Sequence, residues 1–294
     1  MSDSTLEDRI AALPCWRATV DIKPLVGGMT NRNFLVRDPQ AGSFVVRIGQ
    51  DLPEHGVMRF NELAAARAAF AAGLSPEVVF AGEGILVCRY IESRTLVSED
   101  IRDHGRLPAV LDLVRRCHQD IPTFLRGPTL AFWVFQVIRN YLALLGDEPR
   151  SCLFGQLARL RGMAVAVEAA VGPVTLVFGH NDLLAANFLD DGKRLWLIDW
   201  DYAGFNSPLF DLANLSSNNQ FDGSDDDFLL ETYWGVAPDP ARRRAFEAMK
   251  CASLMRETLW GGLSELRSSI DFDYASYTRD YLRRLDRAWD AFDH

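Results

Sequence analysis

The 294-residue chain has few cysteines, and they are widely scattered. They form no Cys-x-x-Cys pair and their number is odd, so neither a zinc site nor a disulfide framework is indicated. Reduced, mostly buried thiols are the expected state. The five are Cys15, Cys88, Cys117, Cys152 and Cys251.

The chain also lacks an excess of positive charge, a secretory leader and a long apolar run. Its formal net charge is −9, so no broad basic surface can neutralise nucleic-acid phosphates, and we expect no nucleic-acid partner. Residues 1–8 are polar and acidic, unlike a signal peptide, and no apolar stretch is long enough for a membrane span. We therefore predict a cytoplasmic protein without a membrane partner. The oligomeric state is not indicated.

The first third of the chain is predicted to form a small sheet with one helix. Short apolar segments are separated by turn signals at Gly27-Gly28 and at residues 38–42. An Ala-rich segment with helical spacing ends at Gly73, a residue type that commonly terminates helices. The expected strands are 23–25, 33–36, 43–48, 77–80 and 85–90, and the expected helix is 57–72.

After Tyr90 the pattern changes to helices, so we predict two lobes, residues 1–91 and 92–294. Pro108 and Pro122 are expected to punctuate the helices. A β-rich island interrupts them, and residues 190–193 supply its hairpin turn. The expected helices are 107–118, 132–145, 151–171 and 274–292, and the island strands are 176–178, 188–189 and 195–198.

Within the island, residues 180–187 read His-Asn-Asp-Leu-Leu-Ala-Ala-Asn. The interval from Asp182 to Asn187 matches the kinase catalytic-loop pattern H-R-D-L-x-x-x-N, with Asn181 at the arginine position. Phosphoryl transfer needs a carboxylate that orients the attacking hydroxyl and oxygen ligands that hold magnesium against the phosphates. We therefore predict that Asp182 is the catalytic base and that His180 braces the loop.

A second acidic group follows the apolar strand 195–198. Asp199 and Asp201 stand where kinases have the metal-binding D-F-G motif, and close carboxylates repel one another unless a cation lies between them. We expect Asn187, Asp199 and Asp201 to bind Mg²⁺. Ordinary turn residues are the alternative, but the ordered set of positions favours the metal site.

A Gly-rich turn and a strand cation indicate a nucleotide site in the first third. Gly28, Thr30 and Asn31 lie between two predicted strands, where small residues can cover phosphates. Arg47 ends a strand and Glu62 follows on the next helix, in the order of the lysine and glutamate that pair in kinases. An exposed Arg–Glu pair is the alternative for Arg47.

The segment 86–91 is expected to cross between the lobes. Its backbone N–H and C=O groups, those of Arg89 and Ile91 among them, are predicted to bind adenine. ATP and Mg²⁺ are therefore the expected cofactors.

In this order, the motifs resemble the choline/ethanolamine kinases, a branch of the aminoglycoside-phosphotransferase-like kinases, from about residue 24 to residue 281. The resemblance implies an α+β, bilobal protein-kinase-like fold with a small antiparallel N-terminal sheet and a mainly helical C-terminal lobe. It also implies that Arg47, anchored by Glu62, binds the ATP phosphates and that Asp211 braces the catalytic loop. The supporting segments are 27–31, 47, 179–182, 198–202, 210–214 and 269–274.

Aromatic residues near the C-terminus indicate a pocket for an ammonium group, because aromatic faces attract cations. Trp260 and Tyr277 match family positions that line the amine pocket, and Phe272 is a further candidate; core packing is the alternative. Where the family usually has another tryptophan this chain has Glu257, and Asn218-Asn219 replace an acidic-tryptophan pair. Glu257 either partners a primary amine or faces solvent, so choline and ethanolamine remain alternatives.

The predicted activity is Mg-ATP-dependent phosphorylation of the hydroxyl group of a small cationic amino alcohol, choline or ethanolamine first. A related kinase that acts on thiamine, an aminoglycoside or a sugar derivative is the nearer alternative. A nucleotide-binding regulatory protein without transferase activity is the alternative of another class. The joint presence of Asp182, Asn187 and Asp199 disfavours it.

Overall fold

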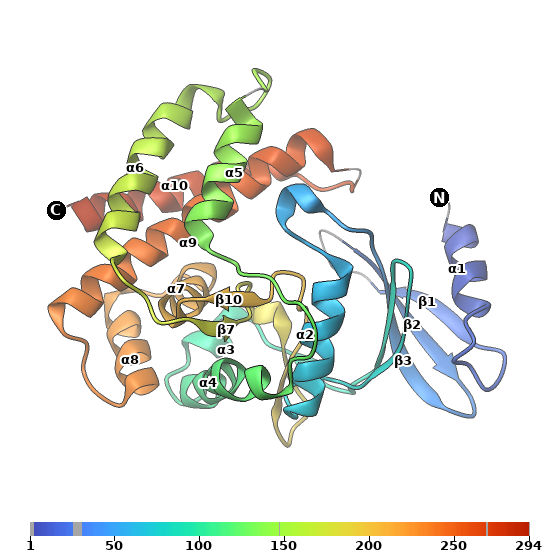
Figure 1. Ribbon diagram of the computed structural model, residues 1–294. Coiled ribbons are helices and arrows are strands. Elements are labelled where there is room, and N and C mark those ends of the chain that lie inside the picture. The colour runs from blue at the N-terminus through green and yellow to red at the C-terminus, as the bar shows by residue number, and fades with distance from the viewer. Residues whose placement is uncertain (1–2, 26–30, 147, 269, 294) are drawn as a thin grey trace.

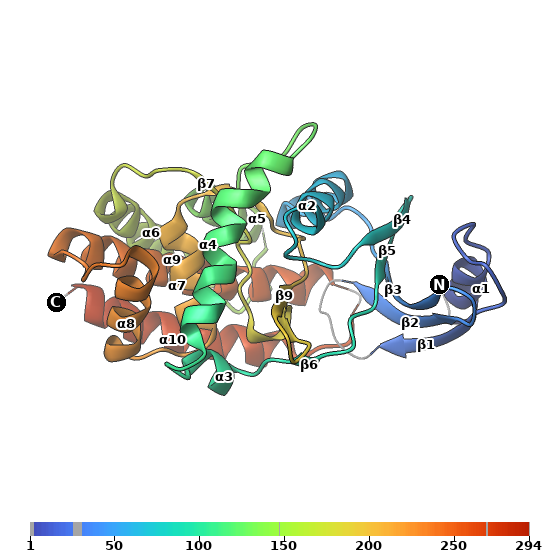
Figure 2. The ribbon, with the colours of Figure 1, turned by 90° about the horizontal axis from the view of Figure 1, so that it is seen from below.

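The structure, a computed structural model, describes residues 3–25, 31–146, 148–268 and 270–293. A sheet lies on one side of the molecule and a larger helical part on the other, with α2 (Arg59–Ala71) between them (Figure 1). The view turned by 90° has the same order, with the sheet and α1 (Asp3–Ala11) at one end (Figure 2). The predicted α+β class is therefore confirmed.

Five antiparallel strands form the N-terminal sheet in the order β1-β2-β3-β5-β4. Each strand covers most of a segment that the sequence predicts as extended, and the bounds differ by no more than a few residues. The strands are β1 (Asp21–Leu25), β2 (Arg32–Asp38), β3 (Gly42–Ile48), β4 (Val78–Gly82) and β5 (Ile85–Arg89).

The two faces of this sheet have different neighbours, because side chains alternate along a strand. Phe44 and Val46 of β3 are buried in a small core with Ile10 of α1. The alternate residues, Val45 and Arg47, face a large cavity between the sheet and the helical part. The pleat of β3 therefore directs a cation into that cavity.

Helix α2 packs against the helical part. Its alanines, Ala65 and Ala69 among them, belong to the main hydrophobic core together with Leu111 of the next long helix. Gly73 takes a left-handed conformation, with φ of 73°, just beyond the end of α2, as the sequence predicts. The lobe boundary at residue 91 stays a prediction, and it falls two residues after the end of β5.

Helices dominate the remainder of the chain. The longest, α9, is buried from Ala245 to Ser264 along most of its faces and contacts α5, α6, α7 and α10. None of the helices in the described ranges combines the length and the apolar character needed to cross a membrane. The helices are α3 (Ser98–Arg102), α4 (Leu107–Phe124), α5 (Val134–Gly146), α6 (Leu157–Val171), α7 (Pro208–Asn218), α8 (Gly223–Trp234), α9 (Pro240–Arg267) and α10 (Tyr274–Asp293).

Two helix bounds differ from the sequence prediction by six residues, and the others by two or fewer. Helix α4 continues past Pro122. This proline lies in the last turn of the helix, so it disrupts few backbone hydrogen bonds. Helix α6 begins at Leu157, because residues 151–156 form a turn and the short 3₁₀ helix η2 (Phe154–Gln156). The predicted helix 274–292 is confirmed as α10, on which Tyr281 and Leu285 are buried.

A β-rich island carries the polar motifs. Strand β7 (Val177–Gly179) pairs with β10 (Gly204–Asn206), and β8 (Phe188–Asp190) pairs with β9 (Leu195–Leu197) and with β6 (Arg94–Thr95). The 3₁₀ helix η3 (Ala185–Asn187) leads into β8. The chain after β7 and the chain after β9 lie side by side, since His180 Nε2 is 2.9 Å from the Ile198 carbonyl oxygen.

Candidate active site

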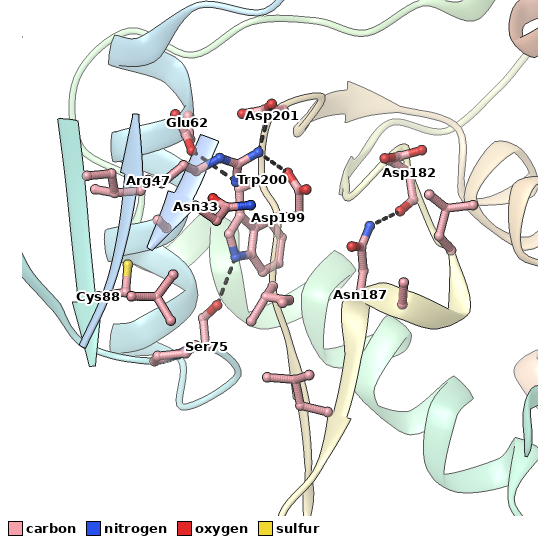
Figure 3. A pocket seen from close by; sticks show the side chains of 18 of the residues that line it. Asn33, Arg47, Glu62, Ser75, Cys88, Asp182, Asn187, Asp199, Trp200 and Asp201 are labelled. Carbon is pink, nitrogen blue, oxygen red and sulfur yellow. Dashed lines mark hydrogen bonds and ion pairs between the residues drawn. The ribbon is translucent and has the colours of Figure 1, made fainter. Parts of the chain in front are cut away.

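A cavity of about 580 Å³ lies between the sheet and the helical part (Figure 3). Strands β3 and β5 form one wall, and the loop after β7, the segment after β9 and helix α9 form the other. The structure therefore gathers most of the site residues predicted from sequence. Those that line the cavity are Arg47, Glu62, Arg89, Ile91, Asp182, Asn187, Asp199, Asp201, Glu257, Trp260 and Tyr277.

The loop after β7 is held by a buried carboxylate from α7. Asp211 accepts hydrogen bonds from the backbone N–H groups of His180 and Asn181, at 2.8 and 2.7 Å, and contacts His118 Nε2 at 2.8 Å. Asn181 has a positive φ of 65°, and its side chain donates to the carbonyl oxygens of Tyr202 and Gly204. This geometry is what a bracing role for Asp211 requires.

His180 connects this loop to the strand beside it. Its Nε2 bonds to the carbonyl oxygen of Ile198, and its Nδ1 accepts the backbone N–H of Asp182 at 3.3 Å. Nδ1 therefore carries no proton, and burial lowers the pKa of His180, so the ring is neutral. His180 does not line the cavity, which agrees with a bracing role.

Asp199 is the second residue of the site with a positive φ, of 71°. The Ser75 hydroxyl donates to the carbonyl oxygen of Leu197 and accepts the Trp200 indole N–H, at 2.5 and 2.8 Å. One hydroxyl thereby ties together the chain on both sides of Asp199. Ile198 is held as well, because its N–H donates to the Asn187 carbonyl oxygen at 3.0 Å.

Arg47 is the centre of a cluster of charges that crosses the cavity (Figure 3). Its guanidinium lies 3.2 Å from Glu62, 2.7 Å from Asp199 and 2.9 Å from Asp201. Arg59 lies 2.6 Å from Glu62 and 2.9 Å from Asp201. These pairs are mostly buried, so the exposed Arg–Glu alternative for Arg47 is wrong. Two guanidinium groups face three carboxylates, which leaves negative charge for a cation to neutralise.

Asn187 and Asp199 are suited to share a magnesium ion with a nucleotide. Asn187 Nδ2 donates to the Asp182 carbonyl oxygen at 2.8 Å, so the side chain offers its Oδ1 to a cation. In the parts of the chain that the structure describes, no group of three or more His, Cys, Asp or Glu side chains is arranged to hold a metal alone. Mg²⁺ is often held by one or two carboxylates together with substrate phosphates, which these residues fit.

Asp201 is also predicted from sequence as a metal ligand. It is buried, and both of its oxygens contact donors of the protein: Oδ1 lies 2.9 Å from Arg59, and Oδ2 lies 2.9 Å from both Arg47 and Asn31. Its role as a metal ligand stays a prediction, and this geometry favours a supporting role instead.

The far end of the cavity combines charged and aromatic side chains. Glu257 is buried, its Oε1 is bonded to Arg256, and its Oε2 accepts the Tyr277 hydroxyl at 2.7 Å. The alternative in which Glu257 faces solvent is therefore wrong. The rings of Trp260 and Tyr277 pack edge to face, with centroids 5.5 Å apart. Phe272 lies outside the cavity wall, is 41% exposed and contacts Tyr277, so its substrate role stays a prediction.

Asp182 lies where the two ends of the cavity meet. Burial raises the pKa of its carboxyl to about 8, and the Arg256 guanidinium, 3.7 Å away, opposes this increase. A pKa of about 8 leaves this carboxyl largely protonated at neutral pH, so Asp182 needs a further cation nearby to act as a base there.

The remaining predicted nucleotide contacts are only partly described. Gly28 and Thr30 lie outside the described residues. Asn31 is buried, and its Nδ2 bonds to Asp201. The Arg89 N–H donates to the Glu77 carbonyl oxygen at 2.8 Å, whereas Ile91 lies beyond the end of β5 and lines the cavity. Of the two predicted adenine contacts, Ile91 therefore fits better through its backbone N–H.

Comparison with known proteins shows to which family the chain belongs. The sequence profile named Choline/ethanolamine kinase matches residues 22–246, more than half of the chain. The chain belongs to the choline/ethanolamine kinase family. It is therefore a phosphotransferase with an alcohol acceptor, in a family that uses ATP. The predicted family and enzyme class are confirmed.

Individual relatives agree with this family. The LicA protein of Haemophilus influenzae is 29% identical over 270 residues, which cover 89% of this chain and 97% of that protein. A probable ethanolamine kinase of Arabidopsis thaliana is 26% identical over 287 residues, 87% of this chain and 76% of that one. A solved choline/ethanolamine kinase family protein from Mesorhizobium loti is 29% identical with a TM-score of 0.79, covering 100% and 97% of the two chains.

More distant structures share the fold. A spectinomycin phosphotransferase in complex with ADP and spectinomycin is 13% identical with a TM-score of 0.57, covering 92% of this chain and 93% of that chain. The kinase-like fold predicted from the sequence is thus confirmed, while the roles of individual residues in this family member remain predictions.

Sequence reasoning missed three residues of the site. Arg59 stands three positions before Glu62 on the same helix, a spacing that allows the two side chains to meet. Arg256 precedes Glu257, and an arginine next to a candidate substrate residue was a usable signal. Ser75 lies in a short connection between α2 and β4, where no pattern marks it.

We expect that Arg47→Met lowers the free energy of unfolding by about 3–5 kcal/mol, because it leaves buried carboxylates without their cation. Chemical denaturation by urea, without nucleotide, measures the change. Arg94→Met is the matched control, since Arg94 pairs with Asp100 at the surface and should cost less than about 1 kcal/mol. Equal costs for the two variants would contradict a structural role of the cluster.

Asp211→Asn should lower the free energy of unfolding by about 3 kcal/mol at pH 7, because a carboxylate that accepts several hydrogen bonds is replaced by an amide. Burial raises the pKa of Asp211, but hydrogen bonds from His118 and the His180 N–H outweigh burial and bring the pKa below its ordinary value. The contribution of Asp211 is therefore present above about pH 4 and is lost as the pH falls through the folded-state pKa.

The measurement for Asp211 is the free energy of unfolding of wild type and Asp211→Asn between pH 7 and pH 3. The difference between the two free energies of unfolding should become smaller below about pH 4. The exposed Asp280→Asn should differ little from wild type at any pH. A gap that stays constant on acidification would show that the Asp211 charge does not stabilise the fold.

Proposed function

We propose that the chain transfers the γ-phosphoryl group of ATP to the hydroxyl group of a small amino alcohol, with magnesium as the metal. One observation carries the proposal: Asp182 lies in a single cavity between residues suited to bind a nucleotide and residues suited to bind an acceptor. It contacts the first group through Asn187 and the second through Arg256. Kinase chemistry needs such a carboxylate between the γ-phosphate and the acceptor.

At the nucleotide end, we propose that Arg47 binds the ATP phosphates and that the backbone near Ile91 binds adenine. Glu62 and Asp201 hold the Arg47 guanidinium by ion pairs, so its position does not depend on the nucleotide. Asn187 would hold the magnesium ion together with Asp199, and the bound ion would supply positive charge to the phosphate oxygens.

In the transfer step, the acceptor oxygen forms a bond to the γ-phosphorus while the bond from phosphorus to the β–γ bridging oxygen breaks, and ADP leaves. Asp182 orients the attacking hydroxyl group and accepts its proton. Arg256 contacts the side chain of Asp182 and Asn187 contacts its backbone carbonyl oxygen, so two residues help to hold it.

The acceptor end favours a cation. Asp182 and Glu257 are two carboxylates beside one guanidinium, that of Arg256. A cationic acceptor offsets the surplus negative charge, which a neutral sugar does not. Trp260 and Tyr277 add aromatic rings, which attract cations.

We further propose that the acceptor nitrogen carries N–H groups. A carboxylate oxygen can accept more than one hydrogen bond, so Glu257 can bind an ammonium N–H in addition to the Tyr277 hydroxyl. A quaternary ammonium has no hydrogen to donate and would need further aromatic faces. This argument supports ethanolamine ahead of choline.

The first test is Asp182→Asn. Loss of a general base typically lowers the rate by about 10²–10⁴-fold, so we expect ethanolamine-dependent ADP release to fall by at least that range. Affinity for a non-hydrolysable ATP analogue with magnesium, measured by calorimetry, should be retained. Asp112→Asn, an exposed position on α4, is the control. Wild-type turnover in Asp182→Asn would contradict the proposed role.

The second test is a series of acceptors: ethanolamine, N-methylethanolamine, N,N-dimethylethanolamine and choline. Since a hydrogen bond to a charged group is worth about 1.5–3 kcal/mol, kcat/KM should fall by roughly 10- to 100-fold from ethanolamine to choline. Glu257→Gln should flatten the series, whereas Glu247→Gln, on the same helix and outside the cavity wall, should not. A preference for choline in the wild-type protein would contradict the N–H proposal alone.

A further inference from the structure

A buried arginine on α9 is not accounted for by the motifs that indicate a kinase. Arg256 is 2% exposed, and its guanidinium carbon lies 4.2 Å from the ring centroid of Tyr202 and 5.7 Å from that of Phe132. A cation removed from water is unfavourable unless anions compensate it. The groups that contact its guanidinium therefore indicate the role of Arg256.

All of the polar contacts given by Arg256 go to the wall of the cavity. Its Nη1 is bonded to Glu257 Oε1 and lies 3.7 Å from Asp182 Oδ1. Its Nε and Nη2 are buried and have no hydrogen-bond partner among the described residues. One nitrogen thus joins the proposed base to the proposed acceptor-binding carboxylate, while aromatic rings surround the remainder of the group.

We propose that Arg256 is the positioning residue of the acceptor half of the site: one guanidinium edge fixes the Asp182 carboxylate at the acceptor hydroxyl and the Glu257 carboxylate at the acceptor nitrogen. Nη1 is hydrogen-bonded to Glu257 and lies 3.7 Å from Asp182, and the rings of Tyr202 and Phe132 pack against the guanidinium, so one group held in place lies between the two carboxylates. Arg256 therefore sets the hydroxyl-to-nitrogen spacing that the site accepts. The inference rests on the proposed function, since it takes Asp182 as the base.

The test compares Arg256→Met, Arg256→Lys and wild type as full-length chains, by kcat and by the KM values for ethanolamine and for ATP. A misplaced catalytic group can cost about 10²-fold in rate, so kcat of Arg256→Met with ethanolamine should fall by about that factor while the KM for ATP changes little. Arg267→Met, an exposed change on the same helix, is the control.

Spacing gives a readout that a purely structural role would not change. Wild type should prefer ethanolamine to 3-aminopropan-1-ol, and Arg256→Lys should reduce that preference several-fold, because the ammonium group of a flexible lysine chain is not held at one place between the carboxylates.

The outcomes separate the inference from the proposed function. An unchanged spacing preference in Arg256→Lys, or an Arg256→Met variant whose KM for ATP rises as much as its KM for ethanolamine, would overturn the positioning role of Arg256. Wild-type protein that phosphorylates no amino alcohol would overturn the proposed function instead. If thermal unfolding shows that Arg256→Met does not fold, Arg256→Lys and its acceptor spacing decide the question.

Discussion

The ion pairs of Arg47 join the two parts of the molecule. The guanidinium extends from β3 of the sheet and meets Glu62 of α2 and the carboxylates of Asp199 and Asp201 beyond β9. Since the cavity lies between these parts, the cluster ties its two walls together (Figure 3). Arg59 supplies a second cation, which pairs with Asp201 and Glu62, so the cluster is a network of ion pairs rather than a single pair. The proposed metal ion would offset the negative charge of its surplus carboxylate.

The second constraint is the backbone beside the cavity. Asn181 and Asp199 have φ of 65° and 71°, a region in which a residue other than glycine is strained by about 1–3 kcal/mol. Asp211 and the Asn181 side chain hold the first by hydrogen bonds, and the Ser75 hydroxyl ties the chain around the second. Surroundings that over-determine the backbone in this way keep Asp182 and Asp199 fixed before any ligand binds.

Much of the fold was predictable because it follows local rules. The alternation of Phe44 and Val46 with Arg47 predicts a strand with one buried face, and Gly73 ends α2 where the periodicity stops. The interval from Asp182 to Asn187 predicts the site for the same reason, since a strand-loop-strand pattern fixes its geometry locally. The start of α6 was missed, because a 3₁₀ turn and the first turn of a helix have similar sequence patterns.

The missed or uncertain site residues depend on contacts that are distant in the chain. Ser75 acts on Leu197 and Trp200, more than a hundred residues away, and nothing near Ser75 indicates this. Asp201 has the sequence position of a metal ligand, yet Arg59 and Arg47 meet it from another part of the chain. Sequence spacing alone cannot tell whether a carboxylate faces a metal or a guanidinium.

Charge links the two ends of the cavity. At the nucleotide end, three carboxylates face two guanidinium groups, and at the acceptor end Asp182 and Glu257 share Arg256. Each end therefore has more carboxylates than arginines, and burial makes ionisation of the extra carboxyl group unfavourable. The raised pKa of Asp182, of which burial is the main cause, is one example. In the proposed function, a metal at one end and an ammonium group at the other would both lower that pKa, so binding of the substrates would itself generate the ionised base.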